Sequence, residues 1–242
     1  MELKQITTVF FDFGGTLFDY LPSTPEVWVK IAKRLGVNVK ADDPRILNGM
    51  TLQNEAYVQL WEVKKGIKFS NLTFEDWKYL DSFVLKELDL DKEGALDVAF
   101  EEFFAREGSY LIFPDCMVTL QKLKELGLQI GLISNTIPKH AHERRPMMEA
   151  HGILEFFKVI ILSSEIGFEK PHKKIFEIAL KEMEIDNPKM AIHVGDCLHA
   201  DIIGSQNAGL VPVLFDPLGI KKADCITVRA LSELPEFLKP KF

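Results

Sequence analysis

Five short apolar runs, each followed by polar residues, constrain the fold of this chain more than any other feature. They cover Val9–Phe11, Leu128–Ile133, Val159–Leu162, Ala191–Val194 and Val211–Phe215. The runs are unbroken rather than alternating, which is typical of strands buried on both faces. Helical patterns lie between the later runs, such as the apolar positions 175, 176, 179, 180 and 183. Alternating strands and helices with short connections predict an α/β fold built on a doubly wound parallel sheet.

Two further helices are predicted from the residues at their ends. Asp115 is placed to cap a helix that runs to Leu126, and the following Gly127 is a common helix stop. A shorter helix is predicted from Asp201 to Ala208, because Gly209 follows it.

The chain between the first two apolar runs has a different character. Helical patterns are predicted over 24–35, 52–63, 74–88 and 96–106, with polar loops and no convincing strand between them. We therefore predict an α/β core domain over residues 1–17 and 113–242 and an inserted helical cap domain over 18–112. Ligands of open parallel sheets bind at the carboxyl ends of the strands, where this insertion leaves the first strand. We expect the cap to act as a lid over that site.

Composition excludes several classes of protein. With 47% apolar and 27% charged residues among 242, the chain is an ordinary globular protein rather than a disordered or fibrous one. Its net charge of −7 argues against a nucleic-acid-binding face. No apolar run approaches the roughly 18 residues that span a bilayer, and the three cysteines form no CxxC pair. We expect a cytoplasmic protein with reduced thiols that binds neither nucleic acid nor membrane.

Four polar stretches follow the predicted strands. They are Asp12-Phe13-Gly14-Gly15-Thr16-Leu17, Ser134-Asn135-Thr136, Glu169-Lys170-Pro171, and Gly195-Asp196 with Asp201 five residues later. Each one alone is ordinary turn chemistry. Together they are far more specific, because each follows a strand and all four are therefore expected at one edge of the sheet.

This order of motifs resembles the haloacid dehalogenase-like (HAD) hydrolase superfamily, over essentially the whole chain. The resemblance implies a Rossmann-like core, with the helical insertion matching the cap that this family carries after its first strand. It further implies a hydrolase, most simply a phosphatase that requires Mg²⁺ and acts on a small phosphorylated substrate.

The residue types agree with that chemistry. The carboxylate of Asp12 can act as a nucleophile and form an aspartyl-phosphate. Asp12 and Asp196 offer the hard oxygen ligands that Mg²⁺ prefers, and the resemblance adds the backbone carbonyl of Gly14. Asp201 is expected to reach the metal through water. The ammonium of Lys170 can neutralise both the nucleophile and the phosphoryl oxygens.

The remaining positions of the motifs predict a phosphate-binding loop. The hydroxyl of Ser134, the amide of Asn135 and the backbone N–H groups near Gly14 and Gly15 can bind phosphoryl oxygens. Thr16 is expected to orient the loop that carries the nucleophile.

Residue 14 departs from the pattern of the family. Most HAD phosphatases have a second aspartate there as general acid and base, a role that contributes about 10²- to 10⁴-fold to a rate. Here the position is Gly14. The favoured interpretation is a phosphatase in which another group, such as Asp19, a cap carboxylate or water, handles the proton.

Two alternatives remain open. One is a phosphonatase or dehalogenase-like hydrolase. Family phosphonatases use a cap lysine, for which Lys30, Lys33, Lys64 and Lys65 are the candidates, whereas family dehalogenases lack the paired metal acids that are present here. The other alternative is a phosphate-ligand-binding protein with little turnover.

Several further residues are given no active-site role. His140, His142 and the pair Arg144-Arg145 are interpreted as ordinary surface, and His193 as a core histidine inside a strand. His199 lies between two candidate acids and is equally compatible with contacting substrate or capping the loop. The aromatic residues Trp28, Tyr57, Trp61 and Trp77 are expected in the core of the cap.

Overall fold

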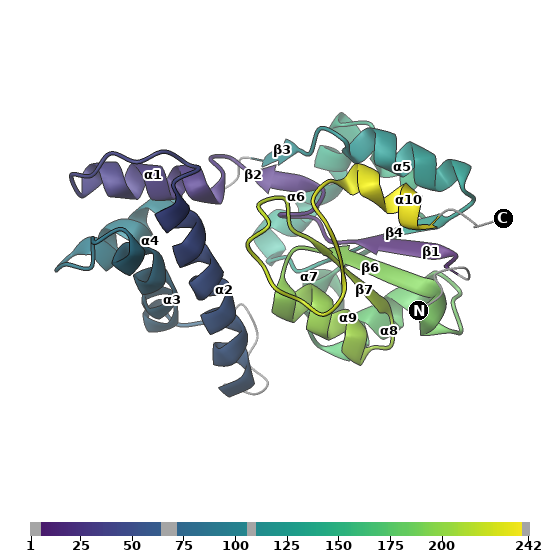
Figure 1. The fold of residues 1–242 in the computed structure, drawn as a ribbon. Coiled ribbons are helices and arrows are strands. Elements are labelled where there is room, and N and C mark those ends of the chain that lie inside the picture. Colours follow the sequence, from purple (N-terminus) through teal and green to yellow (C-terminus); the bar gives the residue numbers. More distant parts are fainter. Residues whose placement is uncertain (1–5, 64–71, 106–109, 239–242) are drawn as a thin grey trace. The chain divides into compact units, whose positions relative to one another are not determined.

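The computed structural model describes residues 6–63, 72–105 and 110–238, and it divides into two compact units. The first unit contains the described parts of residues 1–18, 112–219 and 223–242. The second contains those of 19–111 together with the short segment 220–222. Figure 1 shows the elements of both units along the chain.

A six-stranded parallel sheet forms the centre of the first unit. Its strands are β1 (Thr8–Phe11), β4 (Gln129–Ser134), β5 (Val159–Leu162), β6 (Ala191–Gly195), β7 (Val211–Phe215) and β8 (Ile226–Val228). They lie in the order β5-β4-β1-β6-β7-β8, and every neighbouring pair is parallel. The predicted α/β fold class is confirmed. The strand β8 carries too short an apolar pattern to have been predicted.

The register of the sheet brings the ends of its central strands together. Phe11, the last residue of β1, pairs with Leu132 on β4 and with Val194 on β6. The backbone N–H of the next residue, Asp12, still donates to the carbonyl of Val194 at 2.9 Å. The residues that follow β1, β4 and β6 therefore share one edge of the sheet.

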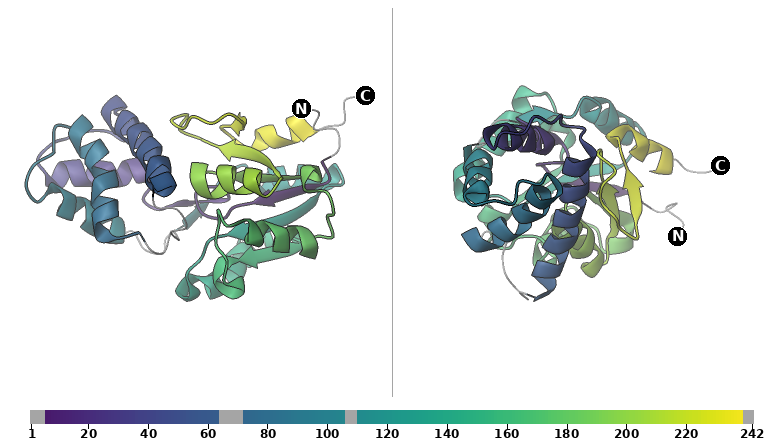
Figure 2. Two further views of the ribbon diagram at one scale, coloured as in Figure 1. Left: turned by 90° about the horizontal axis from the view of Figure 1, so that it is seen from below. Right: turned by 60° about the vertical axis from the view of Figure 1, so that its left-hand side comes forward.

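Helices cover both faces of this sheet. They are α5 (Cys116–Glu125), α6 (Pro138–Ala150), α7 (Ser163–Ile166), α8 (Lys173–Glu182), α9 (Gly204–Asn207) and α10 (Leu234–Leu238). Figures 1 and 2 show α5 and α10 together on one face and α8 and α9 together on the other. On the α8 face, buried Phe10 and Ile133 from the strands pack with Phe176 and Met183. This packing fixes the sheet from which the polar loops project.

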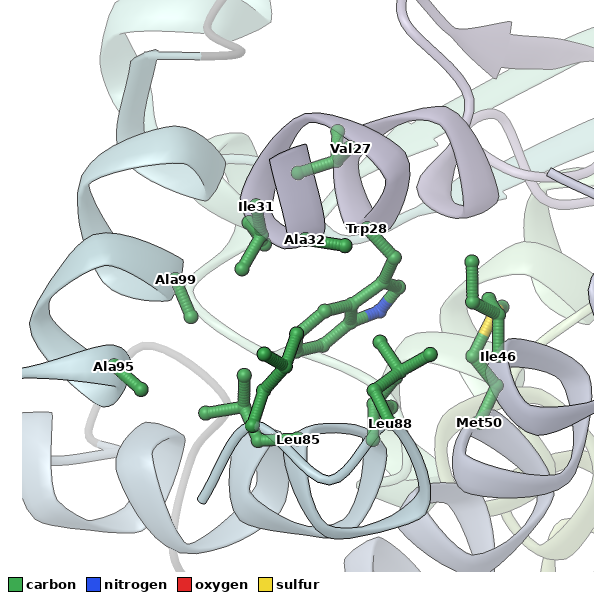
Figure 3. Close-up of a cluster of buried hydrophobic side chains, with 12 residues drawn as sticks. Val27, Trp28, Ile31, Ala32, Ile46, Met50, Leu85, Leu88, Ala95 and Ala99 are labelled. Atoms are coloured by element: carbon green, nitrogen blue, oxygen red, sulfur yellow. The ribbon is translucent and has the colours of Figure 1, made fainter. Parts of the chain in front are cut away.

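The second unit is helical and is built around one tryptophan. Its helices are α1 (Thr24–Arg34), α2 (Pro44–Val63), α3 (Phe74–Glu87) and α4 (Ala95–Ala105). Trp28 is fully buried between residues of all four helices (Figure 3). Capping boxes begin two of them: Glu26 accepts from the backbone N–H of Ser23 at 2.7 Å. At the start of α3, the backbone N–H of Thr73 donates to the carboxylate of Asp76 at 2.9 Å, and the backbone N–H of Asp76 donates to the hydroxyl of Thr73 at 3.2 Å.

Three sequence-based expectations about local structure were wrong. The insertion does contain strands at its ends, β2 (Phe18–Tyr20) and β3 (Tyr110–Ile112), which pair as a separate two-stranded sheet. Each is three residues long, so neither carries a periodic signal. The helix predicted from Asp201 begins earlier, as a π-helical turn over Leu198–Ile203 that runs into α9. Asp115 does lie at the N-cap position, directly before α5, but its carboxylate accepts from the N–H of Ser232 instead of from the helix backbone.

Within the described ranges, no helix combines the length and the apolar character that a bilayer crossing needs.

Candidate active site

Three carboxylates converge at the carboxyl edge of the sheet. Asp12 follows β1 directly, Asp196 follows β6, and Asp201 lies in the π-helical turn after it. Each contributes a carboxylate oxygen to a cluster in which these atoms lie within 4.8 Å of one another. Asp12 and Asp201 are buried and Asp196 is half-buried. The sequence-predicted acids are therefore neighbours in space, although 184 to 189 positions separate Asp12 from the other two.

A buried lysine joins two of these acids. The Nζ atom of Lys170 lies 2.7 Å from Oδ1 of Asp12 and 2.6 Å from Oδ1 of Asp201. Lys170 is only 2% exposed. A lysine so deeply buried is rare unless its charge is paired, and here two carboxylates pair it.

The charges of the cluster shift one another's pKa values. Burial raises the pKa of Asp12 to about 7, against the opposing effect of Lys170 and with further raising by Asp201 and Asp196. Burial would raise the pKa of Asp201 too, but the ammonium of Lys170 and the bond from His193 hold it below its usual range. Burial by itself would lower the pKa of Lys170, and the two carboxylates more than offset it. Lys170 and Asp201 are therefore a charged pair, whereas Asp12 holds a proton more readily than an ordinary aspartate.

The carboxylate of Asp201 is held by three donors. Its Oδ1 accepts from Lys170 and, at 2.9 Å, from Nε2 of His193. Its Oδ2 accepts from the backbone N–H of Cys197 at 2.9 Å. The chain approaches so closely here that a Cβ at Gly195 would lie 2.2 Å from Cγ of Asp201. Most of the lone pairs of Asp201 are occupied by the protein itself.

The loop after β1 is shaped by glycine. Gly15 has φ of +79°, and a Cβ there would lie 2.7 Å from the carboxylate of Asp196. Its N–H donates to the carbonyl of Phe18 at 2.7 Å, and Gly14 forms a bridge with the same residue. Thr16 is fully buried, and its Oγ1 has no hydrogen-bond partner in the part of the chain that the structure describes. Any side chain at residue 15 would push the loop away from Asp196.

Ser134, the last residue of β4, and Asn135, which follows it, make different contacts. Ser134 is buried, and its Oγ lies 3.4 Å from the carbonyl oxygen of Asn135. The amide of Asn135 binds the main chain of Lys170: its Nδ2 donates to the carbonyl at 2.9 Å, and its Oδ1 accepts from the N–H at 2.7 Å. Asn135 was predicted to bind phosphoryl oxygens, whereas its side chain here positions the lysine.

Three contributions to this edge escaped the sequence analysis. His193 binds Asp201, and its only signal was a titratable side chain within an apolar strand. Asp216 directly follows β7, is 2% exposed and accepts from the N–H of Gly219 at 3.0 Å. Arg144 is buried, with its guanidinium 4.2 Å from the ring centre of Phe13 in the nucleophile loop. The expectation of a solvated arginine pair holds only for Arg145, which binds Glu165 at 2.6 Å.

The other histidines and lysines keep simpler roles. On α6, Nδ1 of His140 lies 2.9 Å from a carboxylate oxygen of Glu143. Burial lowers the pKa of His199 to about 4. Lys30 and Lys33 are exposed. Lys64 and Lys65 lie outside the described residues, as does the side chain of Trp61.

The donor set of the acidic cluster fits a hard divalent cation. Its donors are carboxylate oxygens, the ligand type that Mg²⁺ prefers. When all are ionised, three carboxylates and one ammonium leave two negative charges without compensation. A divalent cation would balance them.

Family comparison identifies the class of protein. The model of the haloacid dehalogenase-like hydrolases matches residues 6–209, most of the chain. The chain belongs to this family, and it is a hydrolase.

Individual proteins similar to this chain are phosphatases or HAD hydrolases by name. The chain is 31% identical over 218 residues to a glyceraldehyde 3-phosphate phosphatase of Methanothermobacter thermautotrophicus, covering 88% of this chain and 86% of that protein. It is 26% identical over 219 residues to a ribulose-1,5-bisphosphate 5-phosphatase of Halopiger xanaduensis, covering 87% and 85%. In fold it is similar to the HAD-hydrolase YfnB from Bacillus subtilis, whose crystal structure is bound to magnesium. The TM-score is 0.63 at 21% identity, with 97% and 99% of the chains covered.

Proposed function

We propose that this chain is a Mg²⁺-dependent phosphatase that hydrolyses a small phosphorylated metabolite through an aspartyl-phosphate on Asp12. The observation that carries the proposal is the buried contact of 2.7 Å between Asp12 and Lys170, inside a cluster of three carboxylates. A carboxylate and a phosphate repel each other, so a nucleophilic aspartate needs positive charge fixed beside it. Lys170 supplies one such charge.

The first chemical step breaks the ester bond. An oxygen of Asp12 forms a bond to phosphorus while the bond from phosphorus to the leaving oxygen breaks with its electron pair. The ammonium of Lys170 stays beside the attacking oxygen and offsets the charge of the phosphoryl group. We propose that buried Thr16 and the glycines of the loop orient the nucleophile, and that the hydroxyl of Ser134 binds a phosphoryl oxygen.

The second step releases phosphate. Water attacks the phosphorus of the aspartyl-phosphate, the bond to the Asp12 oxygen breaks, and the carboxylate is restored. Gly14 offers no group to protonate the leaving oxygen or to activate this water. We therefore propose substrates whose leaving group needs little protonation, or a proton that reaches the site through water.

Asp12, Asp196 and the carbonyl of Gly14 would hold Mg²⁺, with Asp201 reaching it through water. When bound, the ion would supply two positive charges that reduce repulsion between Asp12 and the phosphoryl group. This assignment agrees with the donors of the cluster and with the occupied lone pairs of Asp201.

The relatives support a narrower substrate class. Those named above act on three- and five-carbon sugar phosphates. We propose a sugar phosphate of this size for this chain as well. A cap domain that closes over the site would favour such small substrates.

Hydrolysis assays test the proposal. The purified chain is incubated with p-nitrophenyl phosphate, acetyl phosphate, glyceraldehyde 3-phosphate and ribulose 1,5-bisphosphate, with and without Mg²⁺. We expect Mg²⁺-dependent release of phosphate that Asp12→Asn abolishes. Absence of release from every substrate by the well-folded chain would refute the proposal and favour a ligand-binding role.

A second variant tests the role of residue 14. If only the general acid is missing, Gly14→Asp raises turnover of alkyl phosphates by about tenfold or more. Acetyl phosphate serves as the control, because its leaving group needs little protonation. An unchanged rate for alkyl phosphates would mean that another group already handles the proton.

A further inference from the structure

His193 makes a contact with the site that its position in the sheet does not require. It lies in the middle of β6 and is fully buried. Its Nε2 is 2.9 Å from Oδ1 of Asp201, the oxygen that also accepts from Lys170 at 2.6 Å. One oxygen of Asp201 thus joins the histidine to the lysine.

The chemistry of the contact fixes its direction. A carboxylate accepts hydrogen bonds only, so Nε2 of His193 carries the proton and donates. Its Nδ1 is buried and has no hydrogen-bond partner among the residues that the structure describes. The ring of Phe176 packs edge-on against it, with ring centres 5.2 Å apart. The imidazole therefore has a single polar contact in the described chain, and that contact is Asp201.

The geometry of β6 also favours the contact between His193 and Asp201. Side chains of a strand alternate between faces, so His193 and residue 195 lie on the same face of β6. Residue 195 is a glycine, and the carboxylate of Asp201 occupies the space where its side chain would be. Because Gly195 has no side chain, the carboxylate of Asp201 can lie against β6, where His193 binds it.

We propose that His193 is a positioning residue for the reaction: its Nε2–H holds the carboxylate of Asp201, which in turn holds the ammonium of Lys170 beside Asp12. Lysine has four flexible side-chain bonds and no rigid geometry of its own. Its ammonium is located by the two carboxylates that accept from it. The proposal rests on the proposed function only in its effect on turnover, since the hydrogen bonds themselves can be measured without a substrate.

Three substitutions separate the hydrogen bond from the packing of the ring. His193→Gln places an amide N–H where Nε2 lies, His193→Asn places one nearer to Nδ1, and His193→Leu removes the donor while filling the space. Thr119→Val is the control for burial: Thr119 is a buried residue of α5, and its hydroxyl has no partner within the described ranges.

Kinetics give the first readout, with the substrate that the wild-type chain turns over best. We expect His193→Leu and His193→Asn to lower kcat by about 10- to 100-fold, as is usual for partners that orient a site from behind. KM stays nearly unchanged, because His193 does not contact substrate. His193→Gln restores most of kcat, and Thr119→Val has the wild-type value.

The lysine itself gives the second readout. In protein labelled with ¹⁵N at the lysine side chains, the ammonium of Lys170 gives an NMR signal protected from exchange, identified by its loss in Lys170→Met. We expect the signal to persist in His193→Gln and in Thr119→Val and to disappear in His193→Asn and His193→Leu. This experiment decides the contact even if no phosphatase activity is found.

Defined results would overturn the proposal. It is wrong if a folded His193→Leu keeps both the Lys170 signal and kcat, or if the signal is lost while kcat stays unchanged. It is also wrong if the wild-type chain shows no protected Lys170 signal. Should His193→Leu fail to fold, the comparison of His193→Gln with His193→Asn decides the question in the same way.

Discussion

The two units of this chain bury polar groups in opposite ways. In the α/β unit, Lys170 and His193 are almost wholly buried, and both donate to the buried carboxylate of Asp201, at 2.6 and 2.9 Å. In the helical unit, buried Asp81 accepts a bond from the amide of Gln53 at 2.9 Å. The indole N–H of Trp28 has no partner among the described residues. The α/β unit thus contains a cluster in which buried charges pair with one another, whereas the buried acid of the helical unit is bound by a neutral amide.

This difference indicates which buried residues serve a functional site and which stabilise the fold. A buried ion pair contributes little net stability, because desolvation cancels much of the attraction, yet removing one partner is costly. The paired charges of the α/β unit are therefore better explained by a site than by a need for stability. In the helical unit, stability comes from the apolar cluster around Trp28. The following predictions test the comparison, from the largest expected effect to the smallest.

Lys170→Met should affect both activity and stability. It leaves Asp12 and Asp201 facing each other without the ammonium, so we expect kcat to fall about 10²- to 10³-fold. The free energy of unfolding at pH 7 should fall by about 3–5 kcal/mol. Urea denaturation and phosphate release measure the two effects. Lys173→Met, at an exposed position of α8, is the control and should change neither. An equally stable Lys170→Met chain would show that the pair is not held as described.

Trp28→Ala should destabilise the helical unit alone. Loss of a fully buried tryptophan costs about 3–5 kcal/mol through lost burial and the cavity that remains. We expect amide hydrogen exchange to accelerate in α1, α2 and α3 while the protection of β1 and β4 is kept. Phe104→Ala is the control, because Phe104 is 65% exposed. Equal loss of protection in both units would show that they unfold as one.

Asp81→Asn should remove a dependence of stability on pH. Burial raises the pKa of Asp81 to about 7 from 3.8, against a lowering by Gln53. Between these values the folded chain holds a proton that the unfolded chain has released, so stability falls as pH rises from about 4 to about 7. Asparagine keeps the acceptor for Gln53 and avoids this cost.

The expected gain for Asp81→Asn is on the order of 2–4 kcal/mol at pH 8 and close to zero at pH 4. Denaturation curves at the two pH values measure it. Asp97→Asn, at a residue whose side chain is 61% exposed, is the control. An equal gain for Asp81→Asn at both pH values would point to packing rather than ionisation.

Asn135→Ala should have the smallest of these effects. It removes two hydrogen bonds to the main chain of Lys170, which costs about 1–3 kcal/mol when the bonded groups stay buried. We expect kcat to fall about tenfold, with KM nearly unchanged if the amide positions the lysine. Asn135→Asp keeps the acceptor and should be intermediate. A rise in KM instead would support direct binding of phosphate by the side chain.

The sheet was largely predictable because its signal is local. Buried parallel strands need unbroken apolar runs, and the runs at 159–162 and 211–215 match β5 and β7 to the residue. The helices of the insertion were found by the same local periodicity, although α2 begins eight residues before its predicted start at Leu52. Short elements such as β2, β3 and β8 depend on pairing with distant chain, and no window of sequence contains that pairing.

The candidate site was predictable in its members but not in its contacts. Position after a strand was enough to select Asp12 and Asp196. Lys170 was expected after a strand as well, but it lies eight residues beyond the end of β5, with α7 between them. Position along the chain did not show that the amide of Asn135 binds the backbone of Lys170, or that Arg144 packs on Phe13. These contacts depend on side-chain directions in loops, and nothing in local periodicity specifies them.

The sequence by itself determined the kind of fold and the order of the polar stretches. Neighbouring residues are enough to show that a strand is buried on both faces and where a helix ends. Only the tertiary structure decided how the charges are shared. Lys170 meets partners 158 and 31 positions away, and His193 turns from an ordinary core residue into a partner of Asp201. Hydrogen bonds require atoms to meet within about 3 Å, and such distances are set by the packing of the whole α/β unit.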